Sequence, residues 1–159
     1  MKKVNLNIEI DELQLDELVP DEQELVKAAI EATQNSYAPY SMFNVGAAIR
    51  LHNGQVVRGA NQENAAFPVS LCAERTAIFA AQAQHPEQSI DAIAIAAKNV
   101  NGLLTEPVSP CGSCRQVMMQ MEDRYQNSMT VLLYGTNRIY RLKSVKDLLP
   151  LYFVDENMR

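Results

Sequence analysis

Two short stretches, Cys72-Ala73-Glu74 and Pro110-Cys111-Gly112-Ser113-Cys114, decide how this chain is interpreted. They hold all 3 cysteines of the 159 residues, and Glu74 stands two positions after the first of them. A closed structural zinc site uses four protein ligands, whereas a catalytic site uses three and keeps one position for water. Three thiolates beside one acid therefore predict a metal centre that activates water.

A redox pair, simple burial or a structural zinc site would account for less of the cysteine pattern. A Cys-x-x-Cys pair alone is typical of a thioredoxin-like redox site, and three cysteines could be unrelated buried small residues. Neither role requires Pro110 before the second cysteine, or the Cys-Ala-Glu upstream. A structural zinc site would need a fourth ligand, but His52 lies in a predicted turn and His85 in a predicted loop, where we expect both to be solvated. The spacing favours a catalytic zinc ion.

Size and charge limit the kinds of protein this chain can be. Its 159 residues suit one domain with one substantial core, and no repeat or linker divides them. The net charge is −5, and no large cluster of Lys or Arg stands out. Phosphate neutralisation supplies most of the affinity for nucleic acid, so we expect no nucleic-acid partner.

The N-terminal residues and the cysteine usage bear on the compartment. Polar residues interrupt any apolar stretch after the first lysines, so we expect no secretory signal. No apolar run approaches the length of a membrane span, so we expect no membrane partner. An odd number of cysteines without a signal favours a reducing compartment, where thiolates stay available for metal. The predicted location is the cytoplasm.

Apolar periodicity predicts an α/β fold. Helices are expected over residues 21–35, 72–83 and 111–125, and a last short helix capped by Ser144 over residues 144–149, before Pro150. Strands are expected over residues 43–51, 55–60, 90–97, 129–134 and 138–142. This order predicts three layers, with a five-stranded mixed sheet between helices. Cys72 and Cys111 would each begin a helix, whose positive dipole end and free N–H groups stabilise thiolate sulfur.

The first residues have a pattern of their own. Val4, Leu6, Ile8 and Ile10 alternate with polar residues, which predicts either a short edge strand or a loosely held acidic tail. We divide the chain into an N-terminal extension, residues 1–21, and a domain, residues 22–159. The sequence assigns the extension no function.

Several stretches in a fixed order resemble those of the small homotetrameric cytidine deaminases. The resemblance runs from about residue 22 to residue 153, and the stretches that carry it are 37–41, 43–48, 61–65, 72–78, 110–117 and 148–150 with Phe153. The C-x-E … P-C-x-x-C pattern is the all-cysteine form of the zinc deaminase signature. The resemblance implies a cytidine-deaminase-like fold, a homotetramer, and one Zn²⁺ per chain held by Cys72, Cys111 and Cys114.

The resemblance also implies a reaction: hydrolysis of cytidine and 2′-deoxycytidine to uridine and 2′-deoxyuridine plus ammonia, in pyrimidine salvage. Zinc lowers the pKa of a bound water from 15.7 toward ~7, and Glu74 moves protons between that water, the ring N3 and the leaving amine. Three thiolates give the zinc site a formal charge of −1, which weakens the ion as a Lewis acid. Arg75 and the two helix starts are placed to withdraw charge from the sulfurs.

Contacts to the nucleoside are carried over from the same family. Asn61 and Glu63 match the pair that hydrogen-bonds the ribose hydroxyl, and a carboxylate there would favour nucleosides over nucleotides. Phe43 matches the aromatic that stacks on the base, although packing on a strand would explain it as well. The resemblance further implies contacts from Ala73, the Ser109 carbonyl and, in a neighbouring subunit, Phe153.

Three alternative functions share part of the pattern. A blasticidin-type aminonucleoside deaminase carries the same zinc motifs, but Asn61 with Glu63 and the C-terminal Leu-Leu-Pro-x-x-Phe favour cytidine. A tRNA or single-strand DNA base deaminase would need a basic groove, and it usually has His in place of Cys72. A zinc-stabilised binding module without activity would have no need of Glu74. One departure from the family pattern is Phe67, where many relatives carry tyrosine.

Overall fold

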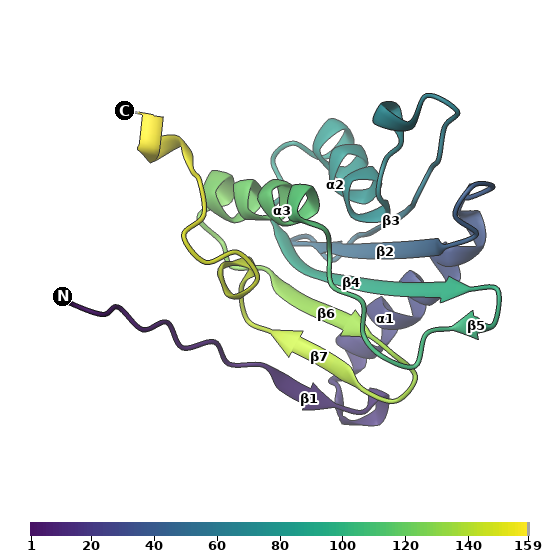
Figure 1. The fold of residues 1–159 in the computed structure, drawn as a ribbon, viewed down its shortest axis with the longest axis horizontal. Helices are drawn as coiled ribbons and strands as arrows, with labels where there is room; N and C mark the ends of the chain where they lie inside the picture. The colour runs from purple at the N-terminus through teal and green to yellow at the C-terminus, as the bar shows by residue number, and fades with distance from the viewer. Residues whose placement is uncertain (159) are drawn as a thin grey trace.

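A computed structural model of the chain describes residues 1–158, in which a mixed β-sheet lies between helices (Figure 1). The strands of this described part are β1 (Asp11–Leu13), β2 (Asn44–Leu51), β3 (Val56–Ala60), β4 (Ile90–Asn99), β5 (Gly102–Leu103), β6 (Thr130–Tyr134) and β7 (Ile139–Leu142). The α-helices are α1 (Pro20–Ala32), α2 (Ala73–Gln84) and α3 (Gly112–Tyr125). Short 3₁₀ turns lie at Leu15–Glu17, Thr33–Asn35, Phe67–Val69, Val145–Asp147 and Asp155–Met158.

The strands are ordered β1-β7-β6-β4-β2-β3, with β5 attached to β4. Every pairing is antiparallel except that of β4 with β6. Parallel neighbours need a long crossover, and here the connection contains α3. The crossover therefore places α3 beside α2 on one face of the sheet, while α1 covers the other face (Figure 1).

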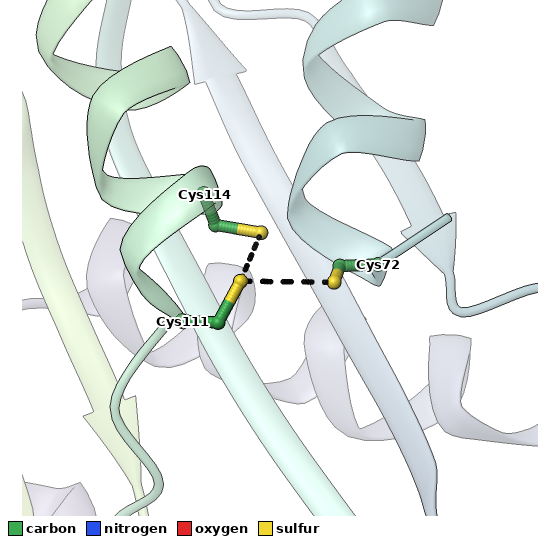
Figure 2. Close-up of side chains that lie close together, drawn as sticks. All are labelled: Cys72, Cys111 and Cys114. Carbon is green, nitrogen blue, oxygen red and sulfur yellow. Dashed lines mark hydrogen bonds between the residues drawn. The ribbon is translucent and has the colours of Figure 1, made fainter. Parts of the chain in front are cut away.

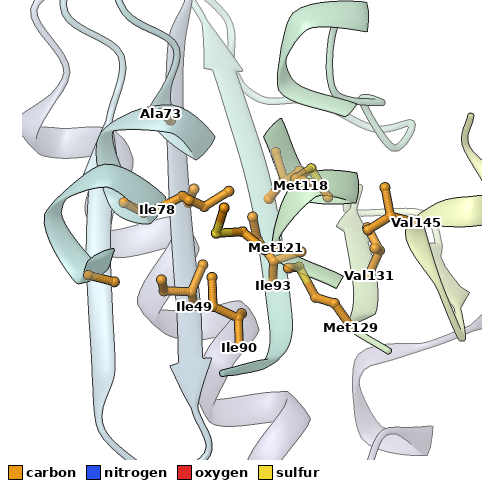
Figure 3. Packing of buried hydrophobic residues seen from close by; sticks show 14 of the residues in the cluster. Ile49, Ala73, Ile78, Ile90, Ile93, Met118, Met121, Met129, Val131 and Val145 are labelled. Atoms are coloured by element: carbon orange, nitrogen blue, oxygen red, sulfur yellow. The ribbon is translucent and has the colours of Figure 1, made fainter. Parts of the chain in front are cut away.

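Strand β4 is buried on both sides, and its two faces differ in side-chain size. Ile93 and Ile95 belong to the core that contains Ile78 of α2 and Met118 of α3. Figure 3 shows Ile93 among the side chains of this core. The alternate positions are alanines (Ala92, Ala94 and Ala96), and they pack against α1. Because successive side chains of a strand point to opposite faces of the sheet, β4 contributes to the cores on both faces.

The helices lie close to the sheet because glycines face them. A Cβ added at Gly46 in β2 would stand 2.1 Å from the Ala29 carbonyl oxygen of α1. A Cβ at Gly59 in β3 would stand 2.4 Å from both the Ala73 carbonyl oxygen and the Ala77 amide nitrogen of α2. Such distances leave no room for a side chain, so Gly59 determines how near the start of α2 lies to the sheet.

The predicted α/β class and three layers are confirmed, and all five expected strands are present within the described residues. The predicted strand count is too low, because β1 and β5 extend the sheet to seven strands. Both additions have only two or three residues, too few for a period-two pattern to be recognised. The alternating pattern at the N-terminus forms no strand over residues 1–10; the edge strand begins at Asp11.

The last predicted helix is wrong in type and length. Ser144 does act as a cap, because its hydroxyl accepts a hydrogen bond from the Lys146 amide. The segment is a single 3₁₀ turn, Val145–Asp147, instead of a helix reaching residue 149. A helix this short gains too few hydrogen bonds to offset the ordering of its first turn. Among residues 1–158, no helix has the length and apolar character needed to cross a membrane.

Candidate metal centre

The starts of α2 and α3 bring the three cysteines together (Figure 2). Cys72 is the N-cap residue of α2 and Cys111 that of α3, both with extended backbone, and Cys114 lies in the first turn of α3. The sulfur atoms of Cys72 and Cys111 are 3.9 Å apart, and those of Cys111 and Cys114 are 3.5 Å apart. All three sulfurs lie within 4.8 Å of one another.

These distances suit a zinc ion. Thiolates bound tetrahedrally at Zn–S distances of ~2.3 Å stand about 3.8 Å from one another. The observed separations of 3.5 and 3.9 Å bracket that value without any disulfide, since all three cysteines are free thiols. Neither N-cap cysteine uses its side chain to cap its helix, so both sulfurs remain available to a cation.

The pKa values of two cysteines depend on contacts within the cluster. A hydrogen bond from Cys114, together with Arg75, lowers the pKa of Cys72 to about 5. The same contact with Cys72, together with burial, raises the pKa of Cys114 well above its usual range. Metal ligation requires deprotonated thiols, and a cation bound by the three sulfurs would stabilise that form.

Glu74 is a buried carboxyl group beside the cysteine cluster. It lies in the first turn of α2, two residues after Cys72, and only 5% of its surface is exposed. Burial raises the pKa of its carboxyl group, because a charged carboxylate is poorly solvated there. A carboxyl with a raised pKa can both accept and return a proton near neutral pH.

Arg75 contacts the cluster from the next position on α2. Its terminal nitrogen donates a hydrogen bond to the Cys72 sulfur at 3.3 Å, and this contact raises the pKa of Arg75. Its Nε is buried and has no hydrogen-bond partner in the described structure. The guanidinium is thus held against the Cys72 sulfur.

Comparison with known proteins agrees with this geometry. Residues 19–129 match the family described as the cytidine and deoxycytidylate deaminase zinc-binding region. The chain belongs to this deaminase family. It is 41% identical over 138 residues to a cytidine deaminase of Halalkalibacterium halodurans, covering 87% of this chain and 98% of the relative. It is 36% identical to a cytidine deaminase of Sporosarcina psychrophila, covering 87% and 95% of the two chains.

Solved structures give the same result. The crystal structure of cytidine deaminase from Burkholderia pseudomallei superposes with a TM-score of 0.70 at 39% identity, covering 82% of this chain and 97% of that one. The family is zinc-binding, and the cysteine cluster suits one zinc ion per chain. This chain is therefore a zinc-dependent deaminase.

The two residues predicted to bind ribose are already hydrogen-bonded within the deaminase. The Asn61 side-chain oxygen accepts from the Val45 amide at 2.7 Å and from the Ser36 hydroxyl at 2.5 Å, and its nitrogen donates to the Phe43 carbonyl at 2.9 Å. Glu63 accepts hydrogen bonds from the Tyr40 amide at 2.8 Å and from the Ser41 hydroxyl. Asn61 thus also positions the backbone of Phe43.

The remaining predicted residues lie in different surroundings. Ala73 is fully buried at the start of α2, and Ser109 is exposed just before Pro110. Phe153 is 55% exposed, and its carbonyl accepts a hydrogen bond from Gln116 at 2.9 Å.

The structure adds contacts that the motifs did not reveal. Arg115 donates from Nε to the Pro110 carbonyl at 2.8 Å and from a terminal nitrogen to the Leu148 carbonyl at 2.7 Å. It thereby ties the turn before Cys111 to the C-terminal segment. A cavity of about 450 Å³ is lined by Glu63 together with Tyr40, Ser41, Phe67 and Ser70. Arg115 lies within the stretch 110–117 that carries the family resemblance, but the sequence alone assigns it no role.

Proposed function

We propose that this deaminase hydrolyses cytidine and 2′-deoxycytidine to uridine and 2′-deoxyuridine, releasing ammonia, as a step of pyrimidine salvage. The observation that carries the proposal is the pairing of a three-sulfur metal centre with one buried carboxyl group, Glu74, on the same helix start. Relatives that match over nearly their whole length are named cytidine deaminases, which supports cytidine as the substrate.

The proposed mechanism depends on proton transfers by Glu74. Bound zinc would make a water molecule acidic enough to lose a proton near neutral pH. The Glu74 carboxylate accepts that proton and delivers it to the ring N3, which makes C4 ready for attack. The hydroxide adds to C4, and Glu74 takes the proton of the new C4 hydroxyl and passes it to the amino group. The C4–N bond then breaks and C4 becomes a carbonyl, so that one water is consumed and one ammonia is released. The raised pKa of Glu74 suits a group that must take up and release a proton in each cycle.

Other residues orient the substrate in this proposal. Phe43 stacks on the base, and the Ser109 carbonyl accepts a hydrogen bond from the leaving amino group. Asn61 and Glu63 bind the ribose hydroxyls, and the Ala73 backbone contacts the base. Glu63 is supported by its position at the rim of the cavity that it shares with Tyr40 and Ser41. Arg75 tunes the sulfurs through its hydrogen bond to Cys72.

The carboxylate of Glu63 gives the proposed site a preference for nucleosides. A phosphate on the sugar would approach a fixed negative charge, and like charges at short range repel. We therefore expect cytidine to be turned over far better than its 5′-monophosphate, measured as uridine or uridine monophosphate formed per minute. Comparable rates for the two would contradict this assignment.

We further propose a homotetramer in which Phe153 completes a neighbouring subunit's site. The exposed position of Phe153 supports this idea, since a large aromatic side chain on the surface is an efficient contact residue. Mixing Phe153→Ala and Glu74→Gln subunits provides a test. Sites that combine Glu74 of one chain with Phe153 of the other would regain activity. No regain in verified mixed assemblies would refute the shared site.

The proposal also includes a cellular location and a division of the chain into two parts. A cytoplasmic location agrees with three free thiols, which a reducing compartment preserves. The division into an extension, residues 1–21, and a domain, residues 22–159, agrees with a family match that begins at residue 19.

The proposed function is tested by incubating the purified protein with cytidine and following uridine formation, with zinc per chain measured on the same sample. Glu74→Gln is the matched variant, because it keeps the size and polarity of the side chain while removing its acid–base function. Undiminished turnover in this variant would show that Glu74 is not the group that transfers the protons.

A further inference from the structure

Residues 4–10, which we call the N-terminal arm, leave the sheet as an extended chain (Figure 1). The pairing of β1 with β7 begins at Asp11, which faces Arg141. The arm precedes Asp11 and extends away from this end of β1. Neither the metal centre nor the proposed reaction involves the arm. It nevertheless carries a regular pattern.

Apolar side chains of the arm are exposed on one side. Val4 is 82% exposed, Leu6 61%, Ile8 43% and Ile10 50%. In an extended chain these alternate residues share one face, and Asn5, Asn7 and Glu9 share the other. A continuous apolar row on an extended segment is unusual on a protein surface and indicates a binding surface.

The strand that continues from the arm is also open at one edge. β1 is the terminal strand of the sheet order and pairs with β7 alone in the described structure. A terminal strand has unpaired N–H and C=O groups along its free edge, which favour the addition of another strand. The free edge of β1 and the apolar row of the arm thus lie on one continuous stretch of chain.

We propose that the arms of two copies of this chain pair as antiparallel strands, with Asn7 facing Asn7 of the second copy. In this register Val4 faces Ile10, and Leu6 faces Ile8. A two-fold axis at Asn7 relates the two arms, so each of these pairs occurs twice. Every apolar side chain of one arm therefore faces an apolar side chain of the other. Cross-strand apolar pairs of this kind are the main stabilising contacts between neighbouring strands.

Charge determines both the direction and the register of this pairing. The basic residues Lys2 and Lys3 precede the arm, whereas Asp11 and Glu12 follow it. Antiparallel pairing in the proposed register places Lys3 opposite Asp11 and Lys2 opposite Glu12. Parallel pairing would instead align like charges. A shift that brings Leu6 opposite Leu6 of the second copy would place Ile10 opposite Lys2, and odd shifts would turn apolar residues toward polar ones.

The acidic residues are held in place for such contacts. Asp11 accepts hydrogen bonds from Arg141 at 3.0 Å, and Glu12 accepts one from Arg138 at 3.1 Å. Both acids therefore stay on β1, close to its free edge. The lysines of the second copy would join clusters of mixed charge instead of forming isolated ion pairs.

Disulfide cross-linking of the zinc-loaded, full-length protein tests the register. Directly opposed residues have Cα atoms about 4.5–5.5 Å apart, which permits a disulfide. Asn7→Cys should therefore form a disulfide-linked dimer when oxidised glutathione accepts the two electrons. The control is Asn5→Cys, whose copies would lie four residues out of register, about 13 Å apart along the strand. Equal cross-linking of both variants, or of neither, would overturn the proposal.

A second measurement does not depend on introduced cysteines. Leu6→Asn combined with Ile8→Asn should weaken pairing without unfolding the chain, since both side chains are exposed in the single subunit. Amide hydrogen exchange over residues 4–10 should then accelerate about tenfold or more relative to the unaltered protein. Cytidine turnover should not change, which separates this proposal from the proposed function. Equal exchange rates in the two proteins would contradict arm pairing.

Discussion

The metal centre and the loops that flank the proposed sugar site are organised in opposite ways. At the metal centre, Cys72, Cys111 and Cys114 hold three sulfur atoms within 4.8 Å of one another, and the buried Nε of Arg75 has no partner in the described structure. In the loops, Asn61 and Glu63 already satisfy much of their hydrogen-bonding capacity with neighbouring backbone. The side chains of the metal centre are therefore available to bind an ion, whereas Asn61 and Glu63 also stabilise the conformation of the loops.

This difference predicts how substitutions divide between activity and stability. Changes at the metal centre should alter turnover more than folding, because those groups gain little from one another before the metal binds. Changes in the loops should alter folding and substrate affinity together. Two buried glutamates provide the sharpest contrast, because Glu74 and Glu122 are both 5% exposed.

The largest effect is expected for Glu74→Gln, which should lower kcat about 10²–10⁴-fold, the usual contribution of a positioned acid–base group. Stability should be preserved, because burial already disfavours the Glu74 carboxylate. The measurement is kcat for cytidine together with the urea midpoint and the zinc content. A fall in zinc content that accounts for the lost activity would contradict the role of Glu74 as a proton carrier.

The matched control is Glu122→Gln. The Glu122 carboxylate accepts hydrogen bonds at 2.8 Å from the Met129 amide, the Val145 amide and the Ser144 hydroxyl. It therefore joins α3 to the residue before β6 and to the 3₁₀ turn Val145–Asp147. Loss of its charge should cost about 1–3 kcal/mol of stability. Its kcat should stay within a few fold of the unaltered protein. If both variants lost only stability, the contrast between the two glutamates would fail.

Gly59→Ala tests whether the metal centre depends on the packing of α2. The added Cβ would meet α2 backbone atoms at 2.4 Å, so the start of the helix must shift. We expect a loss of about 1–3 kcal/mol from overpacking, together with weaker zinc binding. Thermal unfolding and competition with a zinc chelator measure the two effects. Gly112→Ala is the stability control, because nothing lies within 4 Å of its added Cβ.

Arg75→Gln should slow turnover about 10- to 100-fold while zinc remains bound, as is usual when a residue that supports a metal ligand is changed. The reason is its hydrogen bond to the Cys72 sulfur, which shifts negative charge away from the site. Zinc content and kcat measured on one preparation separate the two outcomes. Unchanged kcat would show that Arg75 forms an ordinary ion pair.

The smallest effect concerns acid stability. The Ser41 hydroxyl, aided by the Tyr40 and Ser41 amides, holds the pKa of Glu63 below its usual 4.5. The ionised form therefore stabilises the fold above pH 4.5, and this contribution is lost as the pH falls through the lower folded value. Glu63→Gln should be less stable than the unaltered protein near pH 6. The difference between their free energies of unfolding should become smaller below pH 4.5. A difference that does not change with pH would contradict this linkage.

Much of the structure followed from the sequence, and the misses have physical causes. Periodicity located β2, β3, β4, β6 and β7, because each is long enough to alternate or to form an apolar run. The short β1 and β5 form only because neighbouring strands accept them, and no local pattern reports a neighbour. The spacing of the cysteines indicated the metal centre, because a helix start positions its N-cap residue in a predictable way.

The internal bonds of the loops could not be predicted. Asn61 contacts Ser36 and Val45, which lie 25 and 16 positions away along the chain. Arg115 contacts Leu148 across 33 positions. Such contacts arise from the way loops meet in three dimensions, and single-residue patterns carry no information about them.

The most direct test of the central claim is one experiment on freshly purified protein: zinc per chain and the oxidation state of the cysteines are measured on the same sample that converts cytidine to uridine. We predict one zinc ion per chain, three reduced cysteines, and uridine and ammonia formed in equal amounts. An active sample with a Cys111–Cys114 disulfide and no zinc would contradict the proposed role of the metal centre.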